Sequence, residues 1–270
     1  MKNLKKFTSL MMAMVMSVSC MAFTASAANT TDSFDYQEAY NWAKEVGFSE
    51  GFLRGISEEA LEQVYLDNIG ADELEITEEV SYVSMDDPSE TSFAPFADIP
   101  ESMMQLRATP VKHTSAGKVT KVQIYFTAQW LDGRPWMRND DAFVCSWDSS
   151  LWALDDTTFW GKVEHTRNGG GSAIQLLSST RTSLQSQGGL GWYADISGSP
   201  LGWTPTIRIG FQINPKKTMP EGKTKLSTVE ATYGHNTSAI GGINLSVSGP
   251  TVIINSETDN AAINCRIQHG

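Results

Sequence analysis

The amino-acid sequence predicts a mainly β protein, an antiparallel β-sandwich or jelly roll of about ten strands preceded by a small acidic helical unit. From residue 118 onward, apolar residues recur at every second position in several short segments, which is typical of strands with one buried face. Gly, Pro, Ser and Asn separate these segments, where an α/β fold would have helices. A closed barrel is the alternative arrangement.

The first 27 residues have the features of a secretory signal peptide. Three lysines precede an apolar run at 10–23, and Ala25-Ser26-Ala27 follows with small residues at cleavage spacing. The run is shorter than the roughly 20 apolar residues that a membrane anchor needs. We therefore expect a secreted protein, extracellular or associated with the cell surface, whose mature chain begins near Ala28 and has no transmembrane segment.

Residues 28–84 are expected to form the helical unit. Apolar residues recur at helical spacing within 33–47, and Ser57 is a good N-cap for a second helix. Glu58 and Glu59 then lie at the positive end of that helix dipole. The pattern predicts a helix-turn-helix pair, while residues 74–82 fit either an edge strand or the end of the unit.

One stretch within this unit resembles a known group of sequences. Gly47-Phe48, Phe52-Leu53 and the run from Ile56 to Tyr65 are similar to a short helical stretch of exported Gram-positive bacterial proteins, many without assigned function. The resemblance covers residues 47–65. It implies bacterial export, and it implies no active site and no characterised family.

Charge divides the mature chain into two halves. Residues 28–101 hold 19 acidic residues against Lys44 and Arg54, a net charge of −17, whereas residues 102–270 have a net charge of +3. This asymmetry is typical of an acidic segment that docks on a basic face, or of a solvated acidic surface. We expect no nucleic-acid partner, because that affinity comes mostly from neutralising phosphates.

Four prolines within residues 85–110, without sustained periodicity, predict a linker, followed by a β-sandwich domain at 111–270. The expected strands lie at 118–130, 143–147, 159–165, 172–177, 190–196, 207–213, 226–233, 243–247, 251–254 and 261–267.

Tryptophan is concentrated in the first part of this domain, with five within residues 130–160. Trp130, Trp147 and Trp192 are in phase with apolar strand faces and are expected in the core. Trp136, beside Arg134 in a predicted turn, and Trp152 are the candidates for ligand binding. Exposed indole rings stack on sugar rings, so these three residues predict a glycan site.

Two acidic pairs, Asp140-Asp141 and Asp155-Asp156, are expected in loops on either side of the 143–147 strand. Converging carboxylates can hold calcium, although the spacing matches no calcium loop and solvated turn residues are the alternative. We expect no other metal and no cofactor.

Catalytic signals are weak. Glu164, Asp195 and Glu230 are the carboxylates expected within strands, and a glycosidase needs two such groups facing each other across a cleft. The chain has no Gly-x-Ser-x-Gly elbow and no metal-ligand spacing of histidines. We therefore assign no catalytic residue.

Two cysteines, Cys145 and Cys265, remain after removal of the signal peptide. A disulfide can persist outside the cell, and two buried free thiols are the alternative.

Together these observations predict a secreted non-catalytic protein that binds a glycan or another cell-envelope polymer. One alternative is an extracellular hydrolase of polysaccharide or envelope material. Another is a toxin or self-associating envelope protein in which the acidic segment masks the more basic domain.

Overall fold

A computed structural model describes residues 34–82, 104–131, 140–167, 171–178, 184–196, 203–216, 225–236, 245–248, 251–254 and 258–269. The chain divides into two units, Met1–Asp35 and Tyr36–Gly270, and every described helix and strand belongs to the second. The signal peptide expected at 1–27 lies outside the described residues. No helix in the described part of the chain is long and apolar enough to cross a membrane.

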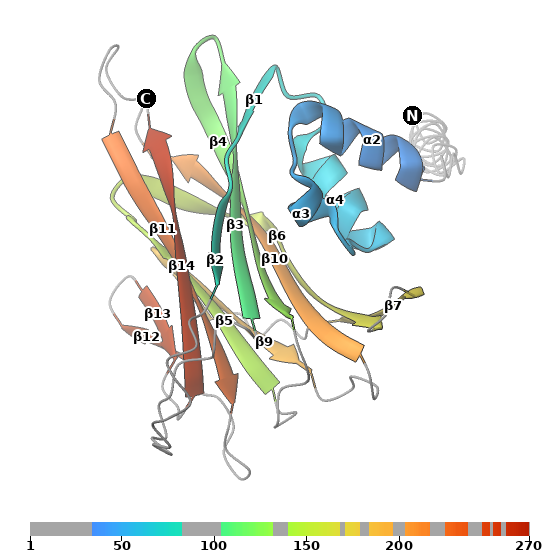
Figure 1. Ribbon diagram of the computed structural model, residues 1–270. Helices are drawn as coiled ribbons and strands as arrows, with labels where there is room; N and C mark the ends of the chain where they lie inside the picture. Colours follow the sequence, from blue (N-terminus) through green and yellow to red (C-terminus); the bar gives the residue numbers. More distant parts are fainter. Residues whose placement is uncertain are drawn as a thin grey trace, which may run out of the picture. The chain divides into compact units, whose positions relative to one another are not determined.

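The described elements are three helices and 14 strands (Figure 1). The helices are α2 (Tyr36–Val46), α3 (Glu50–Leu53) and α4 (Glu58–Asn68). The strands are β1 (Glu73–Ile76), β2 (Glu79–Tyr82), β3 (Met104–Ser115), β4 (Lys118–Trp130), β5 (Asp140–Trp147), β6 (Trp152–Arg167), β7 (Gly171–Ser178), β8 (Leu184–Ser186), β9 (Gly189–Asp195), β10 (Trp203–Pro215), β11 (Lys225–Asn236), β12 (Leu245–Ser248), β13 (Thr251–Ile254) and β14 (Thr258–His269).

The strands confirm the predicted antiparallel sandwich. A seven-stranded sheet has the order β1-β3-β4-β10-β6-β7, with β2 also paired to β3, and a five-stranded sheet has the order β14-β11-β5-β9-β8. A third, two-stranded sheet is the β12–β13 hairpin. All of the strand pairs are antiparallel.

The core lies between the two large sheets. Phe126 of β4, Phe143 of β5 and Phe211 of β10 are each almost fully buried, and the ring of Phe126 packs against both of the others. Trp130, Trp147 and Trp192 belong to the same cluster, which confirms their predicted place in the core. Side chains alternate along each strand, so one face of β4 supplies this core and the other face points away from it.

The helical unit covers the outer face of the seven-stranded sheet. The rings of Phe48 and Phe52 pack against Tyr125, which projects from β4 away from the core. Ser57 caps α4 as predicted, because its Oγ accepts a hydrogen bond from the amide of Ala60 at 3.1 Å. The central part of β4 is therefore buried on both faces, and not on one as its alternation predicts.

A buried ion pair fixes the unit to the sheet. Arg208 Nε of β10 lies 2.6 Å from Glu164 Oε2 of β6, and both side chains are almost fully buried. The guanidinium also donates to the carbonyl oxygens of Phe52 at 3.2 Å and Arg54 at 3.1 Å, while Glu164 Oε1 accepts from the amide of Ser57 at 3.1 Å. The pair therefore forms hydrogen bonds with backbone carbonyl groups at the end of α3 and with a backbone amide at the start of α4.

The acidic segment also makes ion pairs with the sheet at its edge. Glu78 pairs with Arg107 of β3 at 2.7 Å, and Glu75 of β1 pairs with Lys112. These two contacts fit docking on basic residues, one of the two alternatives, whereas Glu38, Glu58 and Glu73 are exposed, as expected for a solvated acidic surface.

The predicted domain boundaries need two corrections. Residues 104–110 were expected in the linker, but they form the first half of β3, which pairs with β4 along its whole length. Residues 74–82 form the edge strands β1 and β2, which belong to the sheet and not to the helical unit. Pro110 is tolerated because it faces the break between the two short strands, where Ile76 pairs with Val111 and Glu79 with Ala108.

Candidate functional site

The outer faces of the two large sheets differ in what covers them. The helical unit covers the seven-stranded sheet, and the β12–β13 hairpin packs on β5 and β9 of the five-stranded sheet. Ala142 and Val144 of β5 form a small apolar cluster with Leu245 of the hairpin, whose amide donates to the hydroxyl of Tyr193 at 3.1 Å. Among the described residues, no element covers the outer face of β11 and β14.

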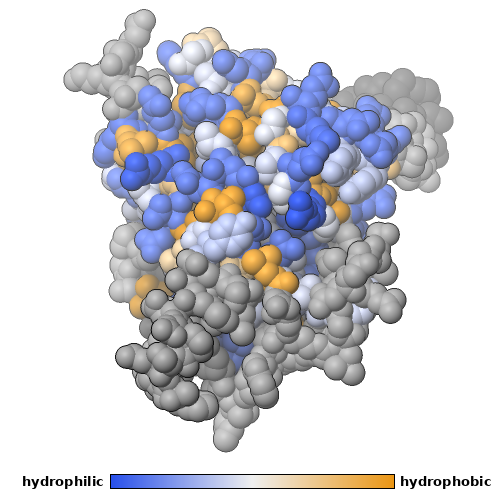
Figure 2. All heavy atoms as spheres, in the orientation of Figure 1, coloured by the Kyte–Doolittle hydropathy of each residue, from blue (hydrophilic) through white to orange (hydrophobic). Residues whose placement is uncertain are grey.

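We refer to this surface as the β11–β14 face. It consists of Leu226, Thr228, Glu230 and Thr232 on β11 and Asn260, Ala262, Asn264, Arg266 and Gln268 on β14. Thr228 lies directly opposite Arg266, and Glu230 directly opposite Asn264. Figure 2 shows hydrophilic residues interspersed with apolar ones over the upper part of the view.

The alternation of side chains explains why the face is polar. Along β14, Ala261, Ile263, Cys265 and Ile267 point into the core, so the residues between them point outward. The side chains at those positions, with the threonines of β11, form a row of amide, hydroxyl and guanidinium groups. Such a row can donate to and accept from an extended polar ligand.

The structure contradicts one of the predicted ligand-binding residues. Trp152 is fully buried in the core at the start of β6, so its ring is not available to a ligand. It looked like a loop residue because it follows Ser149-Ser150, but Leu151 and Trp152 already donate their amides to the carbonyl of Asp148 in a tight turn. Trp136 and Arg134 lie outside the described residues and stay predictions.

The two acidic pairs predicted as weak calcium candidates do not come together. Asp141 of β5 bonds Tyr233 and His235 within the five-stranded sheet, whereas Asp155 of β6 belongs to the seven-stranded sheet. Asp155 accepts hydrogen bonds from Thr157 and Gln212, and Asp156 is exposed. The side chain of Asp140 is outside the described part. No group of three metal-ligating side chains occurs in the described chain.

Asp141 is a buried hydrogen-bond acceptor where the sequence predicts an exposed turn residue. Its Oδ1 accepts from His235 Nδ1 at 2.8 Å and from the amide of Asn236 at 3.1 Å, and its Oδ2 accepts from the hydroxyl of Tyr233. Tyr233 in turn accepts from Trp130 Nε1 at 3.2 Å. Burial raises the pKa of Asp141 and that of Tyr233. This cluster ties β4, β5 and β11 together at one end of the sandwich.

The carboxylates considered for a glycosidase do not form a pair. Glu164 is buried beneath the helical unit and bound to Arg208 on the outer side of the seven-stranded sheet. Glu230 is exposed on the outer side of the five-stranded sheet. The core lies between them, so they cannot face each other across a cleft. The side chain of Asp195 lies outside the described part.

The two cysteines are buried free thiols. Cys145 lies opposite Ala231 and Cys265 opposite Val229, so β11 separates their strands. Two strand spacings amount to about 10 Å, and a disulfide needs Cα atoms within about 7 Å. Of the two alternatives for these cysteines, the structure therefore has the buried free thiols and not the disulfide. Burial raises the pKa of Cys265 to about 12 and that of Cys145 well above its usual range.

The β11–β14 face was not identified from the sequence. The signal was present, since small polar residues occupy every second position of 260–268 and no apolar side chain interrupts them except Ala262. Exposed strand faces are usually polar, and the sequence alone did not show that this face is left uncovered while its neighbours are covered.

Comparison with known proteins finds similarity to solved structures of bacterial surface proteins. No family model matches the chain, and no curated protein matches it. Among solved structures, it is similar to the collagen-binding subdomain of the Enterococcus faecalis surface protein ACE, with a TM-score of 0.32 and 8% identity over 57% of this chain and 90% of that one. The collagen-binding domain of a Staphylococcus aureus adhesin has a TM-score of 0.28 and 11% identity over 53% and 87% of the two chains. The collagen-binding domain of the Erysipelothrix rhusiopathiae surface protein RspB has a TM-score of 0.29 and 6% identity over 63% and 67%. All three values are too low to support an argument about function.

Proposed function

We propose that this chain is a secreted, non-catalytic binding protein that holds a glycan of the extracellular space or cell envelope on the β11–β14 face. The observation that carries the proposal is the row of amide, hydroxyl and guanidinium side chains on two adjacent strands, which no described element covers. The signal-peptide pattern of residues 1–27 supports an extracellular location.

The chemistry of the face favours a neutral hydroxylated polymer over other partners. Protein interfaces contain apolar and aromatic anchors, whereas the face has no aromatic residue, and its apolar side chains are Ala262 and, at one end of the face, Leu226. Nucleic acids need a basic surface, and here Glu230 and Arg266 offset each other's charge. Sugar hydroxyls both donate and accept, as the amides and threonines of the face do.

A binding assay with matched variants tests the proposal. The mature chain is incubated with insoluble cell-wall and plant polysaccharides, and retention is measured for the wild type and for a face variant with Asn264, Arg266 and Gln268 replaced by Ala. The control variant replaces Gln37, Asn41 and Lys44 of α2 by Ala, because these exposed residues carry matching polar groups on the other side of the molecule.

We expect retention by at least one polysaccharide, weakened about tenfold or more in the face variant, since each lost hydrogen bond contributes about 1 kcal/mol. The control variant should bind as the wild type does. Equal retention of the two variants would overturn the proposal. So would a loss confined to Trp136→Ala, because the site would then lie elsewhere, or retention on collagen with none on any glycan.

A further inference from the structure

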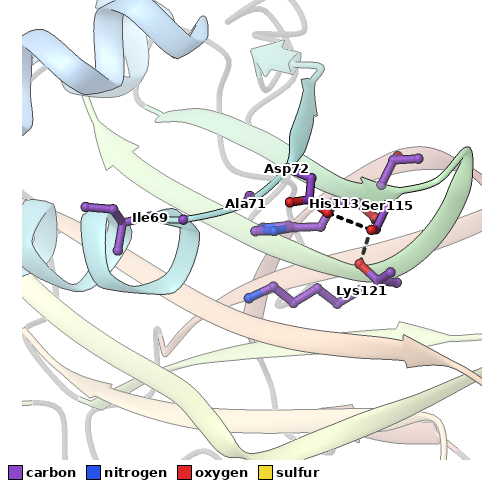
Figure 3. Close-up of a pocket in the computed structure, with 9 residues that line it drawn as sticks. Ile69, Ala71, Asp72, His113, Ser115 and Lys121 are labelled. Carbon is purple, nitrogen blue, oxygen red and sulfur yellow. Dashed lines mark hydrogen bonds between the residues drawn. The ribbon is translucent and has the colours of Figure 1, made fainter.

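A polar pocket lies where the end of α4 meets the β3–β4 hairpin, with a volume of about 240 Å³. Residues 69–72, which follow α4, form one part of its lining, and residues of the hairpin form the rest. Figure 3 shows Asp72, His113 and Ser115 on one side, while the side chain of Lys121 runs along the other. The pocket is on the opposite sheet from the β11–β14 face.

Each side of the pocket carries a polar group with hydrogen-bonding capacity left over. Asp72 Oδ2 accepts from Ser115 Oγ at 2.6 Å, and among the described residues no donor reaches its Oδ1. Lys121 Nζ donates to the carbonyl oxygen of Asp67 at 2.9 Å, and an ammonium has two more protons to donate. The Thr120 hydroxyl donates to the carbonyl of His113 and can still accept.

The side chain of His113 lines the pocket as an uncharged imidazole. Its Nε2 bonds Asn68 Oδ1 at 2.8 Å, and the Asn68 amide nitrogen donates to the carbonyl of Val64 and to the hydroxyl of Tyr125, so the imidazole is the donor in the first bond. Burial lowers the pKa of His113 to about 4, with Lys121 contributing in the same direction. The ring is therefore uncharged near neutral pH.

The two charges offset each other, so the pocket favours a ligand without net charge. The carboxylate of Asp72 attracts cations and repels anions, the ammonium of Lys121 does the reverse, and both can bond a neutral hydroxyl. The volume is below the 300 to 1,000 Å³ range of pockets for drug-sized ligands. We propose that this pocket binds a neutral hydroxylated molecule of the size of one sugar ring.

Occupancy would stabilise the docked helical unit. Lys121 and His113 line the pocket and also bond Asp67 and Asn68, the last residues of α4. A ligand that contacts both the hairpin and the segment after α4 binds the docked state in preference to an undocked one. Ligand binding therefore favours docking by mass action.

The experiment uses the whole mature chain and follows its tryptophan fluorescence, because Trp160 Nε1 donates to Asp67 Oδ2 at 3.2 Å beside the pocket. Glucose, galactose and N-acetylglucosamine are the neutral probes, and acetate and methylammonium are the charged probes. Asp72→Asn and Lys121→Met remove the two charges separately, so one informative variant remains if the other fails to fold. Asp156→Asn and Lys216→Met are matched controls at exposed positions.

We expect saturable binding of a neutral probe with Kd on the order of 1 mM, weakened at least about tenfold by Asp72→Asn or Lys121→Met and unchanged in the controls. Binding of charged probes alone, binding of no probe, or neutral binding that neither pocket variant alters would overturn the inference. The face variant with Asn264, Arg266 and Gln268 replaced should bind these probes normally. Failure at one site is thereby distinguished from failure at the other.

Discussion

Replacement of Arg208 by Met should release the helical unit from the sandwich at a large cost in stability. The variant removes the partner of Glu164 and the donor to the carbonyls of Phe52 and Arg54. Glu164 has no exposed surface and would be left as an uncompensated buried carboxylate. Breaking a buried ion pair in this way costs about 3 to 5 kcal/mol.

The double variant Arg208→Met, Glu164→Leu should recover a substantial part of that loss, because both buried charges are then absent. Equilibrium unfolding in urea, followed by tryptophan fluorescence, measures the free energy of unfolding for each variant. Hydrogen exchange of residues 36–68 reports whether the helices have lost their protection. Lys44→Met is the control, since its pair with Glu50 is exposed and should not affect the unfolding midpoint.

Two results would refute this reasoning. One is a decrease of less than about 1 kcal/mol in the free energy of unfolding for Arg208→Met, because a loss that small is typical of an exposed ion pair. The other is a double variant whose loss equals the sum of the two single losses, since independent sites add and coupled ones do not. Protection of residues 36–68 should also be insensitive to salt, because a buried pair is screened much less than an exposed one.

Three further predictions concern titration, thiols and the core. His113 has a folded-state pKa of about 4 against 6.5 unfolded, so only the unfolded chain binds this proton between those values. The neutral His113 ring therefore contributes about 3 kcal/mol to the free energy of unfolding above pH 6.5, and this contribution is lost as the pH falls to about 4. Urea midpoints measured across this range should fall with decreasing pH, and His113→Gln should make that fall smaller. Thiol reagents should label neither Cys145 nor Cys265 in the folded chain and both after unfolding without reductant, and finding no thiol there would contradict the structure. Trp152→Ala should lower the free energy of unfolding by about 3 to 5 kcal/mol without changing the glycan affinity of the fraction that folds. A variant that keeps the stability of the wild type but loses glycan affinity would show that Trp152 contacts the ligand.

The sequence predicts those strands best that keep one continuous alternation. β4 and β14 do so, and their core residues were identified correctly. β6 was shortened in the prediction because its register shifts opposite Gly210 and Gln212. The shift reverses which residues face the core, so Trp152 and Val163 both point inward although eleven positions separate them. A bulge of this kind hides the first half of a strand from any test of periodicity.

Long-range pairing decides the remaining features. Met104, Leu106 and Ala108 alternate correctly within β3, but the prolines around them indicated a linker. The positions of β1 and β2 on either side of the break opposite Pro110 are what make a strand possible there. The β11–β14 face likewise depends on where the helices and the β12–β13 hairpin pack, which no local pattern specifies.

The contacts of Arg208 and Glu164 also constrain the order of folding. The residues that they join are separated by between 107 and 156 positions in the chain. During synthesis, the helices therefore leave the ribosome long before the strands that hold them. Helices of 11 residues are marginal by themselves in water. We therefore expect the helical unit to gain its full stability only after β6 and β10 have paired, because the closure of these long loops has an entropic cost. A chain interrupted before residue 208 would have its first 82 residues complete and yet lack the surface on which they fold.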